Sequence, residues 1–248
     1  MHGAASLLFL CCLFSVITVS AMADATDSGS QQSNAVHSPA ADFGALAADL
    51  ARAAPAADPQ VLKLATQALD CAAVHGMSPS RRLAVIDYSL VSSVPRLWVF
   101  DLHSKRLLFQ ELVAHGRNSG EHFARAFSNK LGSLQTSLGL FRTQETYVGS
   151  NGYSLRMEGL EPGFNDLAME RAIVMHGAPY VSEKLAKSQG RVGRSWGCPA
   201  VRNGVARQMI DTLKGGQFVF SYYPDQRWLT SSTYLNCRTA STGSARAS

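Results

Sequence analysis

The chain has 248 residues, of which 23 are Lys or Arg and 18 are Asp or Glu, giving a net charge of +5. Hydrophobic residues make up 46% of the sequence, which is enough to bury a core and excludes a chain that is disordered throughout. The five cysteines form no CxxC pair, which disfavours a zinc ribbon, a thioredoxin motif and a cysteine-ligated cluster. The basic residues form no stripe with interleaved aromatic residues, which disfavours nucleic-acid binding.

Residues 1–23 have the pattern of a secretory signal peptide. A largely apolar run over 7–19 is followed by Ala21, Met22 and Ala23, and a run of this length is too short for a typical transmembrane helix. We therefore expect export to the periplasm or cell envelope, with no stable membrane span after cleavage. Because no Lys or Arg precedes the apolar run, an uncleaved membrane anchor is the alternative.

The next part of the chain predicts a flexible tether and then a helical segment over 43–78. Residues 24–42 are rich in Ser, Gln, Ala and Asp and have no apolar periodicity, which is typical of a linker. An amphipathic pattern predicts a first helix over 43–54. Asp58 and Pro59 are a favourable N-cap and first residue for a second helix, which ends at Gly76.

From Leu83 onward, short apolar runs separated by turns predict strands. The predicted strands cover 83–87, 96–102, 106–114, 138–143, 154–158, 172–176 and 217–222, and one helix is predicted over 205–213. This order indicates a strand-rich α+β domain, mostly antiparallel, with helices at its periphery. Residues 226–248 are expected to form a C-terminal extension that is disordered from about residue 238.

Cleavage of the signal peptide would leave three cysteines, at positions 71, 198 and 237. An odd number in an oxidising compartment means that at least one thiol is free or pairs with another chain. One interpretation is three buried or partly oxidised cysteines. The other is a disulfide between Cys71 and Cys237, with Cys198 free for chemistry.

A histidine and a cysteine provide the best candidate for catalysis. His176 ends an apolar strand just before Gly177, and Cys198 lies in the segment 194–201 (RSWGCPAV). An imidazole can take the thiol proton so that the thiolate attacks a carbonyl and forms a thioester. Gly197 would allow the backbone N–H groups of residues 197 and 198 to point at an oxyanion. An inert buried cysteine is the alternative. No ligand spacing surrounds these residues and no G-x-S-x-G motif occurs, so a metal site and a serine nucleophile are disfavoured.

These residues resemble the murein L,D-transpeptidase catalytic-domain family of the YkuD type, in its S-x-G-C-P-A-V subfamily. Other motifs follow the family in the same order, over about residues 80–225: 113–120 (VAHGRNSG), 127–130 (FSNK), 137–139 (SLG), 152–155 (GYSL), 165–166 (ND) and 215–216 (GG). The resemblance implies a YkuD-like, mostly antiparallel β domain as the catalytic domain, without a metal or cofactor.

The resemblance also implies roles for individual residues. Cys198 would be the nucleophile and His176 its base, and the Gly177 carbonyl would orient the imidazole. Ser195 would shape the turn below the nucleophile. The backbone amides of the turn would form the oxyanion hole, namely those of Trp196, Gly197 and Cys198.

The implied substrate is a tetrapeptide stem of peptidoglycan. Cys198 would attack the carbonyl of the third residue and expel the terminal D-alanine. The acyl group would then pass to an amine of a neighbouring stem, giving a 3→3 cross-link. An L,D-carboxypeptidase or amidase that uses water as the acceptor, and a non-catalytic cell-wall-binding module, are the alternatives.

The sequence departs from the wider family at two positions near the cysteine. Trp196 replaces a histidine, and it is expected either to pack against the stem or to lie in the core. Ala200 stands where the wider family has Arg or Asn, so Arg194 and Arg202 are the candidates for binding a substrate carboxylate. The remaining candidates for substrate contact are Tyr180, Tyr153, His115 and Asn118, for which core or turn roles are the alternative. The sequence indicates no oligomeric state.

Overall fold

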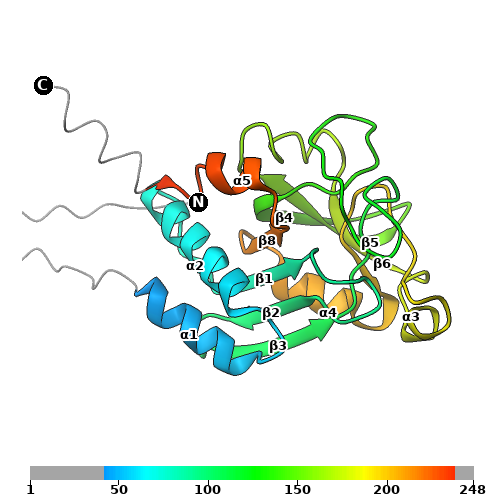
Figure 1. Cartoon of the computed structure of the whole chain (residues 1–248), viewed down its shortest axis with the longest axis horizontal. Coiled ribbons are helices and arrows are strands. Elements are labelled where there is room, and N and C mark those ends of the chain that lie inside the picture. The colour runs from blue at the N-terminus through cyan, green and yellow to red at the C-terminus, as the bar shows by residue number, and fades with distance from the viewer. Residues whose placement is uncertain (1–41, 238–248) are drawn as a thin grey trace, which may run out of the picture. The chain divides into compact units, whose positions relative to one another are not determined.

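The computed structural model describes residues 42–237, which form one compact unit of helices and strands (Figure 1). The predicted signal peptide, nearly all of the tether and the expected C-terminal disorder lie outside the described residues. The elements in chain order are α1 (Phe43–Ala53), α2 (Pro59–Val74), β1 (Arg82–Asp87), β2 (Leu97–Asp101), β3 (Arg106–Glu111), β4 (Gly139–Gly149), β5 (Gly152–Gly159), β6 (Val174–Ala178), α3 (Glu183–Gln189), β7 (Ala200–Arg202), α4 (Asn203–Leu213), β8 (Phe218–Tyr222) and α5 (Gln226–Ser231).

The first two helices begin where the sequence predicts. The Asp42 side chain accepts a hydrogen bond from the Ala45 amide at 2.9 Å and caps α1. The Asp58 side chain accepts from the Gln60 amide at 2.8 Å and caps α2, with Pro59 in the first turn. Both predicted helices are confirmed. None of the helices within residues 42–237 is long and apolar enough to cross a membrane.

The strands form one mixed sheet in the order β3-β2-β1-β8-β4-β5-β6-β7. Five of its neighbouring pairs are antiparallel, and two, β1–β8 and β6–β7, are parallel. The prediction of a strand-rich, mostly antiparallel α+β domain is therefore confirmed. The sequence missed α3, β7 and α5, which have seven, three and six residues and are too short to show a clear periodicity.

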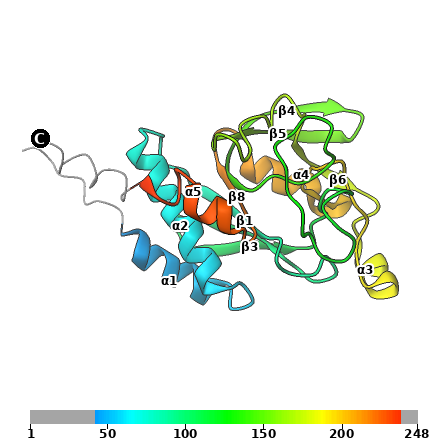
Figure 2. The ribbon, with the colours of Figure 1, turned by 45° about the horizontal axis from the view of Figure 1, so that its top comes forward.

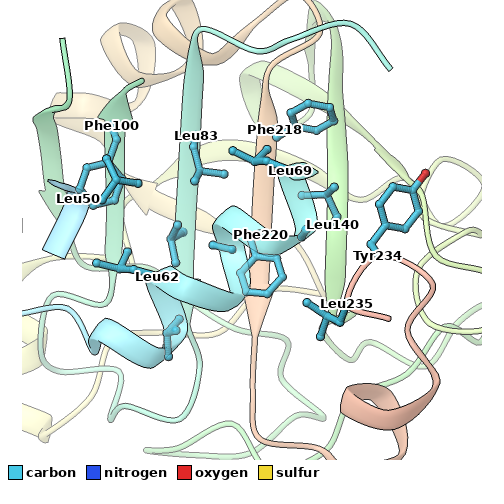
Figure 3. Packing of buried hydrophobic residues seen from close by; sticks show 14 of the residues in the cluster. Leu50, Leu62, Leu69, Leu83, Phe100, Leu140, Phe218, Phe220, Tyr234 and Leu235 are labelled. Carbon is cyan, nitrogen blue, oxygen red and sulfur yellow. The ribbon is translucent and has the colours of Figure 1, made fainter. Parts of the chain in front are cut away.

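Alternate residues of the central strands enter two separate cores, as the period of a strand requires. On one face, Leu62 and Leu69 of α2 pack against Leu83, Phe218 and Phe220, which Figure 3 shows from close by. On the other face, the residues between them in β1 and β8, such as Ile86 and Val219, pack with the buried side of α4. The two helical layers therefore hold the sheet between them.

The C-terminal segment returns to the face of the sheet that α2 covers. Tyr234 and Leu235 pack into the same core as α2, and both are labelled in Figure 3. A disulfide joins Cys71 of α2 to Cys237, across 166 residues of sequence. Up to residue 237, the predicted extension is therefore part of the domain. Figure 2 shows that α3 lies at the opposite end of the domain from α1 and α2.

Candidate active site

His176 lies on β6, between β5 and β7 in the sheet. It pairs with Ser154 of β5 and with Ala200 of β7, and only 4% of its surface is exposed. Its Nδ1 lies 2.9 Å from the Gly177 carbonyl, so Nδ1 carries the proton and donates it. The pKa of His176 is lowered because burial disfavours the charged ring, although the bond to Gly177 acts in the opposite direction. The result is a neutral imidazole whose Nε2 has a free lone pair.

Cys198 lies two residues before β7 and is the free cysteine of the described residues, with 8% of its surface exposed. Its Sγ accepts a hydrogen bond from the Val174 amide at 3.5 Å and donates to the Ala172 carbonyl at 3.7 Å. Burial raises the pKa of the Cys198 thiol, while the Val174 amide and the charge of Arg171 lower it. The thiol therefore rests protonated at the start of β6. Among residues 42–237, no hydrogen bond joins it to His176.

Ser195 organises the turn that leads to Cys198. Its Oγ donates to the Cys198 carbonyl at 2.6 Å and accepts from the Gly197 amide at 3.1 Å. This bond corrects the expectation that the Gly197 N–H is available to an oxyanion, because Ser195 already holds it. In the part of the chain that the structure describes, no backbone oxygen accepts a hydrogen bond from the Trp196 or Cys198 amide, and the Cys198 amide faces its own thiol.

Gly197 is required at its position for steric reasons. Its φ is +123°, a conformation that side chains rarely allow, and an added Cβ would lie 2.8 Å from the Gln135 carbonyl. The neighbouring Trp196 is 73% exposed. Trp196 is therefore a surface residue two positions before Cys198, which excludes the alternative of a core aromatic, and its packing against a stem peptide stays a prediction.

The segment before Cys198 is anchored to the loop that follows β3. The Ser195 amide donates to the His115 carbonyl at 2.9 Å, and the Arg117 amide donates to the Ser195 carbonyl at 2.7 Å. The Ala114 amide donates to the Ala200 carbonyl at 2.8 Å. These bonds join the nucleophile turn and the start of β7 to the loop that follows β3.

The sequence leaves two roles open for His115, substrate contact or a core or turn position, and the structure places it in the second because its side chain is completely buried. Its Nδ1 is 2.8 Å from Nη2 of Arg96, and its Nε2 is 3.2 Å from the Gly120 carbonyl. Burial, reinforced by the charge of Arg96, lowers the pKa of His115 to about 4. Because no surface of His115 is open to a ligand, its role is to support the loop that holds Ser195.

The two arginines expected to bind a substrate carboxylate already have acidic partners. Arg202 donates through Nε and Nη2 to both oxygens of Glu111, at 2.6 and 2.7 Å. Arg194 pairs with Glu121 at 2.5 Å and also donates to the carbonyls of Arg117 and Gly120. Each arginine therefore has an acidic partner, but within the described residues Nη1 of Arg202 and Nε and Nη2 of Arg194 make no hydrogen bond, so carboxylate binding by these residues stays a prediction.

Tyr153 also lies away from the thiol. Its hydroxyl donates to Asp211 of α4 at 2.7 Å, and the Arg207 guanidinium lies 4.5 Å from the centre of its ring. Since Ser154 pairs with His176, the neighbouring Tyr153 points to the opposite face of the sheet. Tyr153 is thus a packing residue for α4 and not a contact of the site.

Tyr180 and Asn118 lie closer to the nucleophile turn. Tyr180 is half-buried after β6, and burial, together with the negative charge that Cys198 carries when ionised, raises the pKa of Tyr180 to about 12. Asn118 is exposed, and it donates to the Ser133 carbonyl at 3.0 Å. Asn118 therefore supports the loop that covers Gly197, whereas Tyr180 remains a candidate for substrate contact.

Arg171 is a residue of the site that the sequence did not reveal. Its guanidinium is half-buried and donates to several oxygens of the loop over residues 128–137. Its charge also acts on the Cys198 thiol. No motif marks this arginine, because its partners lie at least 27 positions away in the sequence. Within the described range, no group of three His, Cys, Asp or Glu side chains is placed to hold a metal ion.

Comparisons with known proteins identify the family of the chain. Residues 53–222 match the family described as L,D-transpeptidase catalytic domain. Similar solved structures include an L,D-transpeptidase from Mycobacterium smegmatis (14% identity, 58% of this chain and 59% of that one, TM-score 0.37). Others are L,D-transpeptidase 1 from Mycobacterium tuberculosis (14%, 56% and 60%, TM-score 0.32) and an L,D-transpeptidase from Stackebrandtia nassauensis (13%, 73% and 78%, TM-score 0.34).

The chain spans 59% and 60% of the two mycobacterial structures that it matches. No curated protein matches it. The family match begins in α1, so it includes α2 as well as the sheet. Since this match covers more than half of the sequence, the chain belongs to the L,D-transpeptidase catalytic-domain family.

Proposed function

We propose that the chain is an exported cysteine L,D-transpeptidase that acts on tetrapeptide stems of peptidoglycan. One observation carries the proposal. The parallel pairing of β6 with β7 places the free Cys198 thiol beside the strand of His176, whose Nδ1 is held by the Gly177 carbonyl. A neutral imidazole fixed through Nδ1 has the tautomer that a general base needs at Nε2.

The first half-reaction forms a thioester. Nε2 of His176 takes the Cys198 proton, and Sγ attacks the carbonyl carbon of the third stem residue. The tetrahedral oxyanion accepts hydrogen bonds from the N–H groups of Trp196 and Cys198. The intermediate collapses as the imidazolium gives its proton to the leaving amine, so that D-alanine departs and the acyl group stays on sulfur.

The second half-reaction transfers the acyl group. An amine of a neighbouring stem attacks the thioester carbonyl and loses a proton to His176. The carbon–sulfur bond breaks, and the thiolate recovers that proton. The product is a 3→3 cross-link when the acceptor is a stem amine, and a tripeptide when it is water.

The resting thiol has to turn before the reaction begins. It donates to the Ala172 carbonyl in the structure, whereas proton transfer requires Sγ to approach the His176 ring. Binding of the stem beside the exposed Trp196 would displace the thiol from Ala172. A buried and protonated thiol also resists oxidation until substrate arrives.

Export is supported by the apolar pattern over 7–19 and by the pairing of Cys71 with Cys237, because disulfides persist in oxidising compartments. The net charge of +5 would favour association with an anionic cell-wall polymer. These observations are the basis for placing the enzyme in the periplasm or cell envelope.

The proposal is tested by incubating the protein with a disaccharide-tetrapeptide and analysing the products by mass spectrometry. A cross-linked dimer together with released D-alanine is the expected result. Release of D-alanine without a dimer would instead indicate a carboxypeptidase, and no reaction at all would indicate a cell-wall-binding module. The Cys198→Ala protein is the matched blank for each of these products.

A further inference from the structure

We propose that Arg171 is a positioning residue for the nucleophile: its guanidinium fastens the 128–137 loop over the Gly197 turn and supplies the positive charge that stabilises the Cys198 thiolate. The inference deepens the proposed function and rests on it, because it takes Cys198 as the nucleophile. It gives Arg171 a role that neither the sequence motifs nor the hydrogen bonds of the thiol indicate.

The contacts of Arg171 connect it to one loop. Nη1 donates to the Ser128 carbonyl at 2.6 Å and to the Ser137 hydroxyl. Nη2 donates to the Gln135 carbonyl at 2.5 Å and to the Ser133 hydroxyl at 3.2 Å. All four acceptors are neutral oxygens. Within residues 42–237 no carboxylate forms an ion pair with Arg171, so its charge is not neutralised by an acid.

The same guanidinium lies against the nucleophile turn. A Cβ added to Gly197 would be 3.5 Å from Nη2 of Arg171 and 2.8 Å from the Gln135 carbonyl that Arg171 binds. Arg171 also directly precedes Ala172, whose carbonyl accepts the thiol proton and whose φ is +52°. The segment from Arg171 to Val174 therefore presents a cation, a carbonyl and an amide to one sulfur atom.

Burying the charge of Arg171 costs free energy, and a neutral side chain could hold the loop without that cost. Taking a guanidinium out of water without an acidic partner is unfavourable, and burial lowers the pKa of Arg171. The neutral serine and carbonyl acceptors compensate only its hydrogen bonds. A thiolate at Cys198 would supply the missing negative charge, and reciprocally the cation would offset the burial that raises the pKa of Cys198.

The other titratable groups near the thiol are neutral at pH 7. Burial raises the pKa of Tyr88 above its ordinary value, and the pKa of Tyr180 is raised to about 12. Burial lowers the pKa of His176, which keeps that ring neutral. In the part of the chain that is described, Arg171 is thus the one cation whose charge acts on Cys198.

The experiment measures how fast iodoacetamide alkylates Cys198 between pH 5 and pH 10, with the peptide that contains residue 198 quantified by mass spectrometry. Only the thiolate reacts, so the midpoint of this profile reports the ionisation of Cys198. Removing the charge in Arg171→Gln is expected to move the midpoint to higher pH and to slow alkylation at pH 7 roughly tenfold. Arg171→Lys is expected to retain most of the wild-type rate.

Two control proteins separate the charge from the loop contacts. Arg207→Gln removes a cation from α4 that packs on Tyr153, and its profile is expected to match wild type. Ser133→Ala removes one loop partner of Arg171 and keeps the charge, so it is expected to lower the unfolding temperature without moving the midpoint. If Arg171→Gln does not fold, Arg171→Lys decides: a midpoint near wild type supports the inference, and a midpoint well above that of wild type overturns it.

An unchanged profile in folded Arg171→Gln would overturn the inference. Alkylation requires no turnover. Failure of the inference about Arg171 can therefore be distinguished from failure of the proposed function. An unshifted profile in a protein that forms dimers refutes the role of Arg171 alone. A shifted profile in a protein that never releases D-alanine refutes the transpeptidase proposal alone.

Discussion

Two regions of the sheet, the part under α1 and α2 and the part around Cys198, are held together by different interactions. Under α1 and α2, large apolar side chains such as Leu62 and Phe220 pack between helices and strands (Figure 3). A disulfide also joins α2 to Cys237, the last described residue. Around Cys198, the turn is held by hydrogen bonds from Ser195, by a glycine and by a half-buried arginine. The region under α1 and α2 is an ordinary apolar core, whereas the region around Cys198 is held by polar contacts that surround one sulfur atom.

This difference separates stability from chemistry. Apolar burial contributes free energy of unfolding and tolerates small shifts, whereas a nucleophile requires atoms placed within a few tenths of an ångström. We therefore expect changes under α2 to lower stability and leave turnover per folded molecule intact. Changes around the 195–198 turn should lower turnover and leave stability nearly unchanged.

The largest expected effect is at His176. Replacing it in His176→Gln removes the general base and should lower the rate of D-alanine release by about 10²–10⁴-fold, with little change in unfolding temperature. His103→Gln, in the turn between β2 and β3, is the matched control, and its rate should equal wild type. Equal rates for the two variants would show that His176 is not the base.

A substitution in the apolar core tests the other side of the comparison. Leu62→Ala should lower the free energy of unfolding by about 2–5 kcal/mol, because it removes buried methyl groups and leaves a cavity. Urea unfolding measures this, and the adjacent exposed Lys63→Ala serves as its control. Turnover is compared at a temperature where Leu62→Ala is folded. A large loss of turnover per folded molecule there would contradict the claim that this core affects stability alone.

His115, in the loop that holds Ser195, is expected to make stability depend on pH. Its folded-state pKa of about 4 lies below the usual value for histidine of about 6.5, so the unfolded chain binds more protons between these limits. Stability should therefore rise with pH from 4 to 6.5, by on the order of 3 kcal/mol, and be flat above that window. His115→Asn should show a smaller slope in the same unfolding series, and an undiminished slope would assign the effect to another group.

The smallest expected effect is at Ser195. Ser195→Ala removes the hydroxyl that holds the Gly197 amide and the Cys198 carbonyl, and each such bond is worth about 1 kcal/mol. Turnover should fall roughly tenfold while the pH midpoint of Cys198 alkylation stays unchanged. Ser195→Thr keeps the hydroxyl and should recover part of the rate. A rate in Ser195→Ala equal to wild type would mean that the turn is rigid without this residue.

The sequence predicted the parts of the molecule that depend on local pattern. The Asp58–Pro59 start of α2 and the apolar runs of the central strands are recognisable because capping and alternation are properties of neighbouring residues. The sequence also singled out His176 and Cys198 as a couple. The strand β4 extends six residues beyond its predicted end at 143, because its outer half is polar and pairs with β5 as an exposed hairpin.

Long-range pairing explains what the sequence could not predict. The sequence predicts that Arg202 and Arg194 bind a substrate carboxylate, but it does not reveal their acidic partners Glu111 and Glu121, which lie 91 and 73 positions away. Arg171 was overlooked for the same reason, since its loop partners lie between 34 and 43 positions away. Charged side chains take their roles from the fold, and no local pattern indicates which acid or loop will meet them.

The most direct test of the central claim is the fate of the Cys198 sulfur during turnover. The protein is incubated with the disaccharide-tetrapeptide, quenched in acid and digested, and the peptide that contains residue 198 is examined by mass spectrometry. We predict that this peptide carries the acyl group of the stem without its D-alanine, and that Cys198→Ala has neither the adduct nor any release of D-alanine. Release of D-alanine by Cys198→Ala at the wild-type rate would contradict the account.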